Sequence, residues 1–393
     1  MPGTDNPPPL RGFPQAEYER RTAQAQRLMA TAGIDVVLLT AEPEVRYFSG
    51  FHTQFWESPT RPWFLLLPRE GKPVAVIPEI GAAGMAATWL DDIRTWPAPR
   101  PEDDGLSLLL QALRELTGGR GRIAAPLGHE SHLRMPAGDF RSLCERLSPT
   151  PVVDATGLLR QLRVVKSEAE IDKIRYACQL ASDAFEALPD AIAIGQSERE
   201  ICGTLKIDLL RRGADGSPYL IGASGPGGYD NIIMGPTDRI VGEGDILIID
   251  TGTTYDGYFC DFDRNFAFGP PSDAARRAYE VTYAATEAGL AAARLGATTT
   301  DLWAAMWAVL EAGGALGNDV GRLGHGLGMQ LTEWPSNRPG DDTPLAPGMV
   351  LTLEPGMAFA PGKLMVHEEN IVIREHGAEL LSRRAAPVMP VIA

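Results

Sequence analysis

The sequence lacks several features that mark particular classes of protein. Its 393 residues include only four cysteines, and no two form the C-x-x-C pair typical of redox and zinc sites. Scattered thiols are typical of a reducing compartment. No apolar run reaches the roughly 18 residues that a membrane-spanning helix needs, and the opening MPGTDNPPPL lacks the basic and apolar regions of a secretory signal. We therefore expect a soluble cytoplasmic protein with no membrane partner.

Basic residues are also scarce. The chain has 36 lysines and arginines against 51 aspartates and glutamates, which gives a net charge of −15. An acidic surface repels phosphate backbones, so we expect no nucleic-acid partner. Apolar residues form 44% of the chain and charged residues 22%, the balance of a folded globular protein. A chain of this length is long enough for two domains.

Short apolar runs alternate with amphipathic stretches over the first part of the chain. The apolar runs predict strands at 35–40, 62–68, 72–78, 123–126 and 151–156. The amphipathic stretches predict helices at 16–32, 104–117 and 137–147. Strands that alternate with helices are typical of an α/β domain, here with a largely parallel or mixed sheet. We place this domain at residues 1–158.

The pattern changes in residues 159–393. Ser167 stands three residues before Glu170, the capping box that begins a helix, and apolar residues follow at helical spacing. Further helices are expected at 196–212, 272–295 and 299–313. The remainder is rich in strand patterns with glycine and proline turns, so we expect a second domain of the α+β class.

The segment ILIIDTGTTYDGYFCDFDR carries the first chemical signal. Asp256-Gly257 is a two-residue hairpin signal that places Asp250 opposite Asp263. Because side chains alternate along a strand, both aspartates share one face with Asp261. Carboxylates on one face repel one another unless a cation lies between them. An exposed acidic face is the alternative, but the neighbouring apolar and aromatic residues favour a buried hairpin and hence a metal site.

Three more segments carry residue types that bind metals. His325 lies among the glycines of GHGLG, Glu354 ends an apolar strand before Pro-Gly, and Glu368 follows His367 in an apolar strand, where charges need partners. Taken singly, His325 is equally consistent with a satisfied core residue, and Glu354 with a turn. Together with the hairpin aspartates they form a set of oxygen ligands and one nitrogen that suits two divalent cations.

The order of these motifs resembles one known family. An Asp, a second Asp eleven positions later, G-H-G-x-G, L-E-P-G-M and a Glu before a closing apolar strand are similar to the pita-bread metallohydrolases of family M24. DVVLLTAEPEVRYFSGF and RVVKSEAEIDKIRYA resemble the openings of the two domains in its prolidase, aminopeptidase P and creatinase branch. The resemblance implies a creatinase-type N-terminal domain in residues 1–158 and a pita-bread catalytic domain in residues 159–393.

The resemblance also implies a catalytic centre and a homodimer. Two divalent metal ions per subunit would be held by Asp250, Asp261, His325, Glu354 and Glu368. Asp261 and Glu368 would bridge the two ions, with Mn²⁺ as the leading metal and Co²⁺, Fe²⁺ or Zn²⁺ as alternatives. The implied reaction is amide hydrolysis, foremost of the bond before proline in Xaa-Pro dipeptides and short peptides. A bridging hydroxide would attack, and Glu354 would act as general base and then acid.

The chain departs from the family pattern around the substrate. Accessory histidines and an arginine of the relatives are replaced here by Ile233 or Met234, Gly321, Thr332 and Val366. The predicted replacements for substrate contact are Tyr229, Thr332, Glu333 and His367. A metal-dependent hydrolase or lyase of a small molecule such as ectoine, creatine or dimethylsulfoniopropionate therefore stays open beside the peptidase. A non-catalytic binding module is a third alternative, but it would not need all five ligands.

Overall fold

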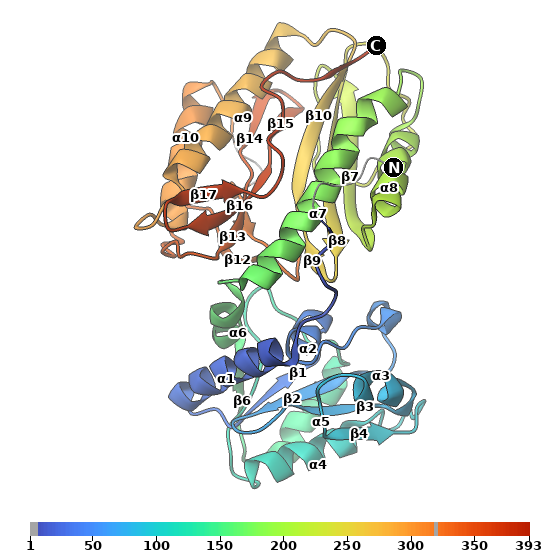
Figure 1. The fold of residues 1–393 in the computed structure, drawn as a ribbon, viewed down its shortest axis with the longest axis vertical. Coiled ribbons are helices and arrows are strands. Elements are labelled where there is room, and N and C mark those ends of the chain that lie inside the picture. The colour runs from blue at the N-terminus through green and yellow to red at the C-terminus, as the bar shows by residue number, and fades with distance from the viewer. Residues whose placement is uncertain (1–6, 318–320) are drawn as a thin grey trace. The chain divides into compact units, whose positions relative to one another are not determined.

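The structure is a computed structural model that describes residues 7–317 and 321–393. The chain separates into two compact units (Figure 1), and each has its own hydrophobic core. One unit is Leu10–Arg163, and the other is Val164–Ala393 together with residues 7–9. The chain passes between them at the end of α6 (Thr156–Arg163), shortly after the boundary placed from the sequence. Among the described residues, no helix combines the length and apolarity needed to cross a membrane.

The first unit is built on a six-stranded mixed sheet in the order β4-β3-β2-β1-β5-β6. Its strands are β1 (Val36–Leu39), β2 (Phe64–Pro68), β3 (Val74–Pro78), β4 (Ile93–Trp96), β5 (Ile123–Ala125) and β6 (Val152–Asp154). Its other helices are α1 (Gln15–Ala32), α2 (Glu42–Ser49), α3 (Ala82–Ala86), α4 (Leu106–Thr117) and α5 (Ala137–Leu147). β2 pairs antiparallel with β1 and β3, whereas the other pairs are parallel. The α/β prediction is confirmed.

Strand β4 and the short helices α2, α3 and α6 of this unit were not predicted from the sequence. β1, β2 and β3 are buried along their whole length, so they read as continuous apolar runs. β4 has the sequence IRTW and is mostly half-exposed, so it gives no such run. Helix α2 is only eight residues long and follows β1 closely, which hides its periodicity.

The second unit contains two five-stranded sheets and a separate hairpin. The first sheet comprises β7 (Gly216–Pro226), β8 (Asp245–Tyr255), β9 (Tyr258–Phe259), β10 (Phe262–Phe268) and β18 (Val391–Ile392). The second comprises β11 (His325–Gly326), β12 (Glu333–Ser336), β13 (Val350–Leu353), β16 (Glu369–Arg374) and β17 (Gly377–Leu380). The hairpin is β14 (Gly356–Ala360) with β15 (Lys363–Val366). This mixture of helices and hairpins confirms the α+β prediction.

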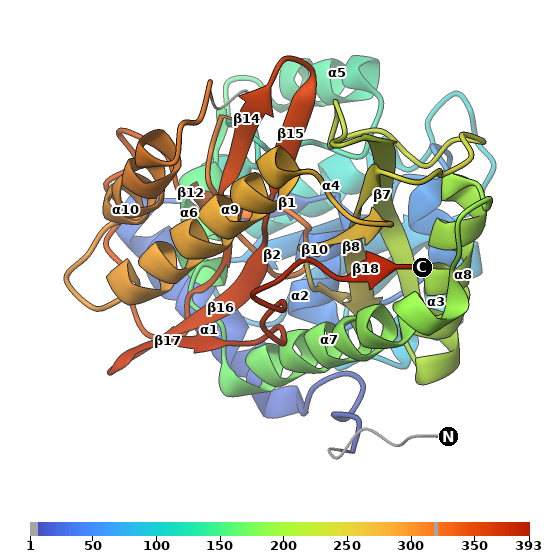
Figure 2. The ribbon, with the colours of Figure 1, turned by 90° about the horizontal axis from the view of Figure 1, so that it is seen from above.

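Four longer helices belong to this unit. They are α7 (Glu168–Ala187), α8 (Glu198–Arg212), α9 (Asp273–Ala292) and α10 (Thr299–Ala312). Helix α7 contacts β8 and α8 contacts β7, while α9 contacts the β14–β15 hairpin and α10 packs against α9. Figure 2 shows strands of the unit between α7 and α9. The predicted capping box of α7 is present, because Ser167 Oγ accepts from the Glu170 main chain while the Glu170 carboxylate accepts from the Ser167 main chain.

One strand prediction in this unit is wrong. His367 and Glu368 do not lie inside a strand, because β15 ends at Val366 and β16 begins at Glu369. At this point the chain leaves the β14–β15 hairpin and enters the second sheet. The His367 main-chain N–H donates to the Pro355 carbonyl at 3.1 Å, which ties this crossing to the end of the Glu354 segment. Because Glu368 lies outside both strands, the alternation of side chains along a strand does not fix its direction.

Candidate metal centre

The hairpin of β8 with β9 and β10 carries the aspartates. Asp256 and Gly257 have φ values of 48° and 80°, the left-handed conformations that a two-residue turn of this kind needs at both positions. Tyr255 pairs with Tyr258 beside the turn, and Asp250 pairs with Asp263 further along. The predicted turn and the predicted Asp250–Asp263 pairing are confirmed.

His325 is held by close backbone packing on both sides. A Cβ atom on Gly324 would lie 2.2 Å from the Thr352 carbonyl oxygen, and one on Gly326 would lie 2.5 Å from the Trp334 carbonyl oxygen. Both positions therefore require glycine. The His325 Nδ1–H donates to the Gly326 carbonyl at 2.8 Å. This hydrogen bond leaves the lone pair on Nε2, the atom that faces Asp261.

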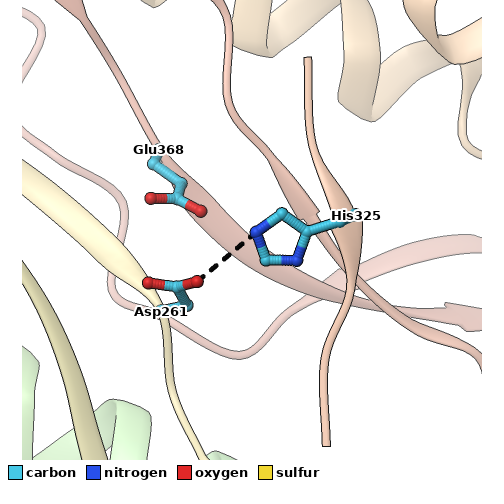
Figure 3. A group of neighbouring side chains, drawn as sticks. All are labelled: Asp261, His325 and Glu368. Atoms are coloured by element: carbon cyan, nitrogen blue, oxygen red, sulfur yellow. Dashed lines mark ion pairs between the residues drawn. The ribbon is translucent and has the colours of Figure 1, made fainter. Parts of the chain in front are cut away.

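Asp261, His325 and Glu368 form the centre of the cluster. All three are buried, and one potential ligand atom of each lies within 4.8 Å of the others. Figure 3 shows both carboxylates and the imidazole directed toward one another, with 3.5 Å between His325 Nε2 and Asp261 Oδ2. They come from three segments that are far apart in the chain, so only the folded unit brings them together. The arrangement is one that could hold a metal ion.

Asp250 and Glu354 belong to the same charged cluster, because both act on the pKa of Asp261 and Glu368. Burial raises the pKa of Asp261 and Glu368 well above the usual range, and the neighbouring carboxylates raise these values further. Burial also raises the pKa of Asp250 to about 7 and that of Glu354 to about 8. Each residue as a whole is half-buried, although the Asp250 Oδ1 atom is itself buried.

Several carboxylate oxygens in the cluster have no hydrogen-bond partner among the described residues. They are Asp250 Oδ1, Asp261 Oδ1, Asp263 Oδ2 and Glu368 Oε1, and all four atoms are buried. Unpaired buried polar atoms are rare and costly, whereas oxygen-rich sites with one imidazole bind divalent cations well. The buried, unpartnered oxygens therefore fit metal ions at this position.

The structure places three of the four predicted substrate contacts among partners inside the protein. The Tyr229 hydroxyl donates to Asn265 Oδ1 at 3.0 Å and accepts from the Val366 main chain. Glu333 accepts from Lys166 Nζ at 3.1 Å and from the main chain of residues 329–330. His367 is buried and contacts the side chains of Thr286, Tyr279, Tyr283 and Arg384. Thr332, by contrast, is half-buried and accepts from Arg322 Nη2 at 3.2 Å.

A buried ion-pair network around Glu369, which the sequence did not reveal, holds the main chain of Glu368. Glu369 is fully buried and accepts from Arg264 Nη2 at 3.1 Å, Arg384 Nη1 at 3.2 Å and the Ala385 main chain at 2.8 Å. Arg264 Nη1 also donates to the Glu368 carbonyl at 3.1 Å. In the sequence, only the position of Glu369 at the start of an apolar run pointed to a buried charge. Its partners could not be predicted, because they lie on distant segments.

Comparisons with known proteins agree with this architecture. The family model described as metallopeptidase family M24 matches residues 172–375, and that of the creatinase/prolidase N-terminal domain matches residues 21–165. The chain is 32% identical to "Probable dipeptidase PepE" of Mycobacterium tuberculosis over 370 residues, 94% of this chain and 95% of that protein. It is 26% identical to "Xaa-Pro dipeptidase" of Lactobacillus delbrueckii subsp. lactis over 354 residues, 88% and 91% of the two chains.

Solved structures show the same fold over nearly the full length. The crystal structure of dipeptidase PepE from Mycobacterium ulcerans superposes with a TM-score of 0.84 at 29% identity and covers 97% of this chain and 99% of that chain. The prolidase from Thermococcus sibiricus has a TM-score of 0.86 at 24% identity, over 96% and 100% of the two chains, a likeness of fold alone.

Proposed function

Since the chain belongs to metallopeptidase family M24, we propose that it is a dipeptidase that hydrolyses Xaa-Pro dipeptides at a centre of two divalent metal ions. The cluster of buried, unpartnered carboxylate oxygens around His325 carries this proposal. The relatives named dipeptidase and Xaa-Pro dipeptidase support the substrate class. We further assign residues 159–393 as the catalytic domain and residues 1–158 as the N-terminal domain, in a cytoplasmic homodimer.

Five residues would hold the ions. They are Asp250, Asp261, His325, Glu354 and Glu368, with Asp261 and Glu368 shared between the two ions and Mn²⁺ as the leading metal. Bound divalent ions supply Lewis acidity to a carbonyl and lower the pKa of water in the site. The central position of Asp261 and Glu368 supports a shared role, because each has its pKa raised by Asp250, by Glu354 and, for Glu368, by Asp261.

Side chains of the protein would transfer the protons and orient the ligands. Glu354 takes a proton from the attacking water and delivers it to the leaving nitrogen, as general base and then acid. In the metal-free protein, burial raises the pKa of Glu354 to about 8. The His325 Nδ1–H bond to the Gly326 carbonyl keeps Nε2 free for the centre. Tyr229, Thr332, Glu333 and His367 stay predictions as substrate contacts.

One observation favours a second candidate, a hydrolase or lyase of a small non-peptide molecule. Exposed Ile233 and Met234 and half-buried Thr332 stand where the resemblance leads us to expect accessory histidines. Apolar side chains cannot donate or accept protons, so a substrate that needs no such relay would suit the site. Ectoine, creatine and dimethylsulfoniopropionate represent this class.

The test is hydrolysis by metal-free protein reloaded with Mn²⁺, with Glu354→Gln as the control. We expect release of proline from Ala-Pro and Gly-Pro that depends on metal and is lost in the variant. Turnover of ectoine, creatine or dimethylsulfoniopropionate, with no proline released by protein whose metal content has been verified, would replace the peptidase with the second candidate.

A further inference from the structure

Arg322 lies three residues before His325 and points along the neighbouring strand. Its Nη2 donates to Thr332 Oγ1 at 3.2 Å, and its Nη1 donates to Ser336 Oγ at 3.5 Å. Ser336 is the cross-strand partner of His325 in the pairing of β11 with β12. The guanidinium is therefore held beside the strand pair that positions His325.

Among the described residues, no ion pair neutralises the charge of Arg322. Within residues 7–317 and 321–393, Arg322 has no carboxylate within salt-bridge distance, and its two hydrogen bonds go to neutral hydroxyls. Arg264 and Arg384 of the same unit, in contrast, both pair with Glu369. Because a guanidinium has five N–H donors, several donors of Arg322 remain for a ligand.

The charge also acts on the candidate centre. Burial and the neighbouring carboxylates raise the pKa of Glu354 and Asp261, and the positive charge of Arg322 opposes this rise at both residues. The guanidinium is thus close enough to influence both carboxylates without pairing with either.

We propose that Arg322 determines substrate specificity by binding the free C-terminal carboxylate of the dipeptide. This inference rests on the proposed function. In a dipeptide the carboxylate is one residue, at most about 3.6 Å of chain, from the scissile carbonyl. The Cα atoms of Arg322 and His325 are three residues apart, at most about 11 Å. The long arginine side chain can bring its guanidinium closer to the centre than this distance. Thr332 and Ser336 hold the guanidinium fork, whose geometry matches a carboxylate in a two-point contact.

The chemistry predicts which substrates are excluded. A dipeptide amide or a tripeptide has no negative charge at this position, so it would leave the charge of Arg322 unpaired when bound. A charge-assisted contact of this kind corresponds to a preference of about 10- to 100-fold. Selection for dipeptides over longer peptides is therefore assigned to one side chain.

The experiment compares Ala-Pro with Ala-Pro-amide in the Mn²⁺-reloaded wild type and in Arg322→Met and Arg322→Lys. We expect the wild type to favour Ala-Pro by about 10- to 100-fold in kcat/KM. Arg322→Met should remove this preference through a higher KM for Ala-Pro, with Ala-Pro-amide turnover kept within about threefold. Arg322→Lys should restore part of the preference, because it keeps the charge but loses the fork. L-proline should inhibit the wild type more strongly than L-prolinamide, and Arg322→Met should remove this difference.

Exposed Arg338, whose side chain donates to the Pro339 carbonyl at 3.2 Å, provides the matched control. Arg338→Met should keep the wild-type preference, and metal content must equal that of the wild type in every variant. Equal loss on both substrates in Arg322→Met, or equal turnover of both by the wild type, would overturn the role of Arg322 while the peptidase stands. Failure of metal-loaded wild type to release proline from either substrate would overturn the peptidase and this inference together.

Discussion

The side-chain amide of Asn370 forms two hydrogen bonds with the main chain of Asp261. Its Oδ1 accepts from the Asp261 N–H at 2.9 Å, and its Nδ2 donates to the Asp261 carbonyl. The Asn370 main chain is itself fixed by donation to Ser382 Oγ at 3.0 Å. Asn370 thus ties β16 to the short segment between β9 and β10 that carries the proposed shared ligand.

We expect Asn370→Ala to weaken metal binding while the protein still folds. Loss of the amide leaves two buried main-chain groups without partners, which costs about 2–4 kcal/mol of unfolding free energy, and a displaced ligand costs about 10- to 100-fold in metal affinity. Denaturant unfolding and Mn²⁺ titration measure the two effects. Asn231→Ala, in a loop of the same unit, is the control. Unchanged Mn²⁺ affinity in Asn370→Ala would show that the two hydrogen bonds from the Asn370 amide do not position Asp261.

Gly324→Ala tests the backbone packing beside His325. The new Cβ would meet the Thr352 carbonyl at 2.2 Å, at a residue with φ of 128°. We expect a loss of stability of several kcal/mol, on the order of 3, and loss of metal retained on gel filtration. Gly340→Ala is the matched control, because Gly340 also has a positive φ, 79°, but no described atom lies within 4 Å of its added Cβ. Equal effects of the two substitutions would assign the cost to backbone strain alone.

The carboxylates of the centre predict how pH affects the metal-free protein. Burial raises the pKa of Asp250 to about 7 and of Glu354 to about 8, whereas both groups titrate near about 4 in an unfolded chain. The folded state therefore keeps protons that the unfolded chain releases. The resulting stability is present below about pH 4 and is lost as pH rises through these raised pKa values.

We therefore expect the Tm of protein treated with a chelator to fall by several degrees between about pH 6.5 and 8.5. The pKa of His325, lowered by burial to about 4, has the opposite effect on stability, but only below about pH 6.5. Mn²⁺ binding should release protons near pH 6.5, as measured by calorimetry in buffers of different ionisation enthalpy. A Tm that rises over this range, or binding without proton release, would contradict the charge cluster described above.

Glu369→Ala tests the buried network behind Glu368. Removal of this carboxylate leaves Arg264 and Arg384 without their shared partner, and loss of one member of a buried ion pair costs about 3–5 kcal/mol. Denaturant unfolding of the metal-free protein measures the cost apart from metal binding. Glu375→Ala, at an exposed turn after β16, should change stability by less than about 0.5 kcal/mol. A cost below about 1 kcal/mol for Glu369→Ala would mean that the network contributes little.

The parts of the structure that could be predicted from the sequence depend on local rules. Asp256-Gly257 fixed the register of the hairpin, so the opposition of Asp250 and Asp263 followed from counting residues. The capping box at Ser167 marked the start of α7 for the same reason. The two fold classes followed from the alternation of strands and helices in one half and its absence in the other.

The parts that could not be predicted depend on contacts between distant segments. Asn370 and Asp261 are 109 residues apart, and nothing near either residue indicates the other. Arg322 lies in the motif that revealed His325, yet its lack of an ion pair with any described carboxylate is visible only in the folded unit. The separation of β15 from β16 at His367-Glu368 reflects a change of sheet, which an apolar run does not reveal.

The central claim is that the cluster holds two divalent ions, and metal analysis tests it most directly. Metal-free wild type, Asp261→Asn and Glu368→Gln would be reloaded with Mn²⁺, freed of excess and measured by mass spectrometry of the bound metal. We expect about two ions per chain in the wild type and loss of both in either variant, because the proposed shared ligands serve both ions. Wild type that retains no more metal than the two variants, while circular dichroism shows all three to be folded, would contradict the claim.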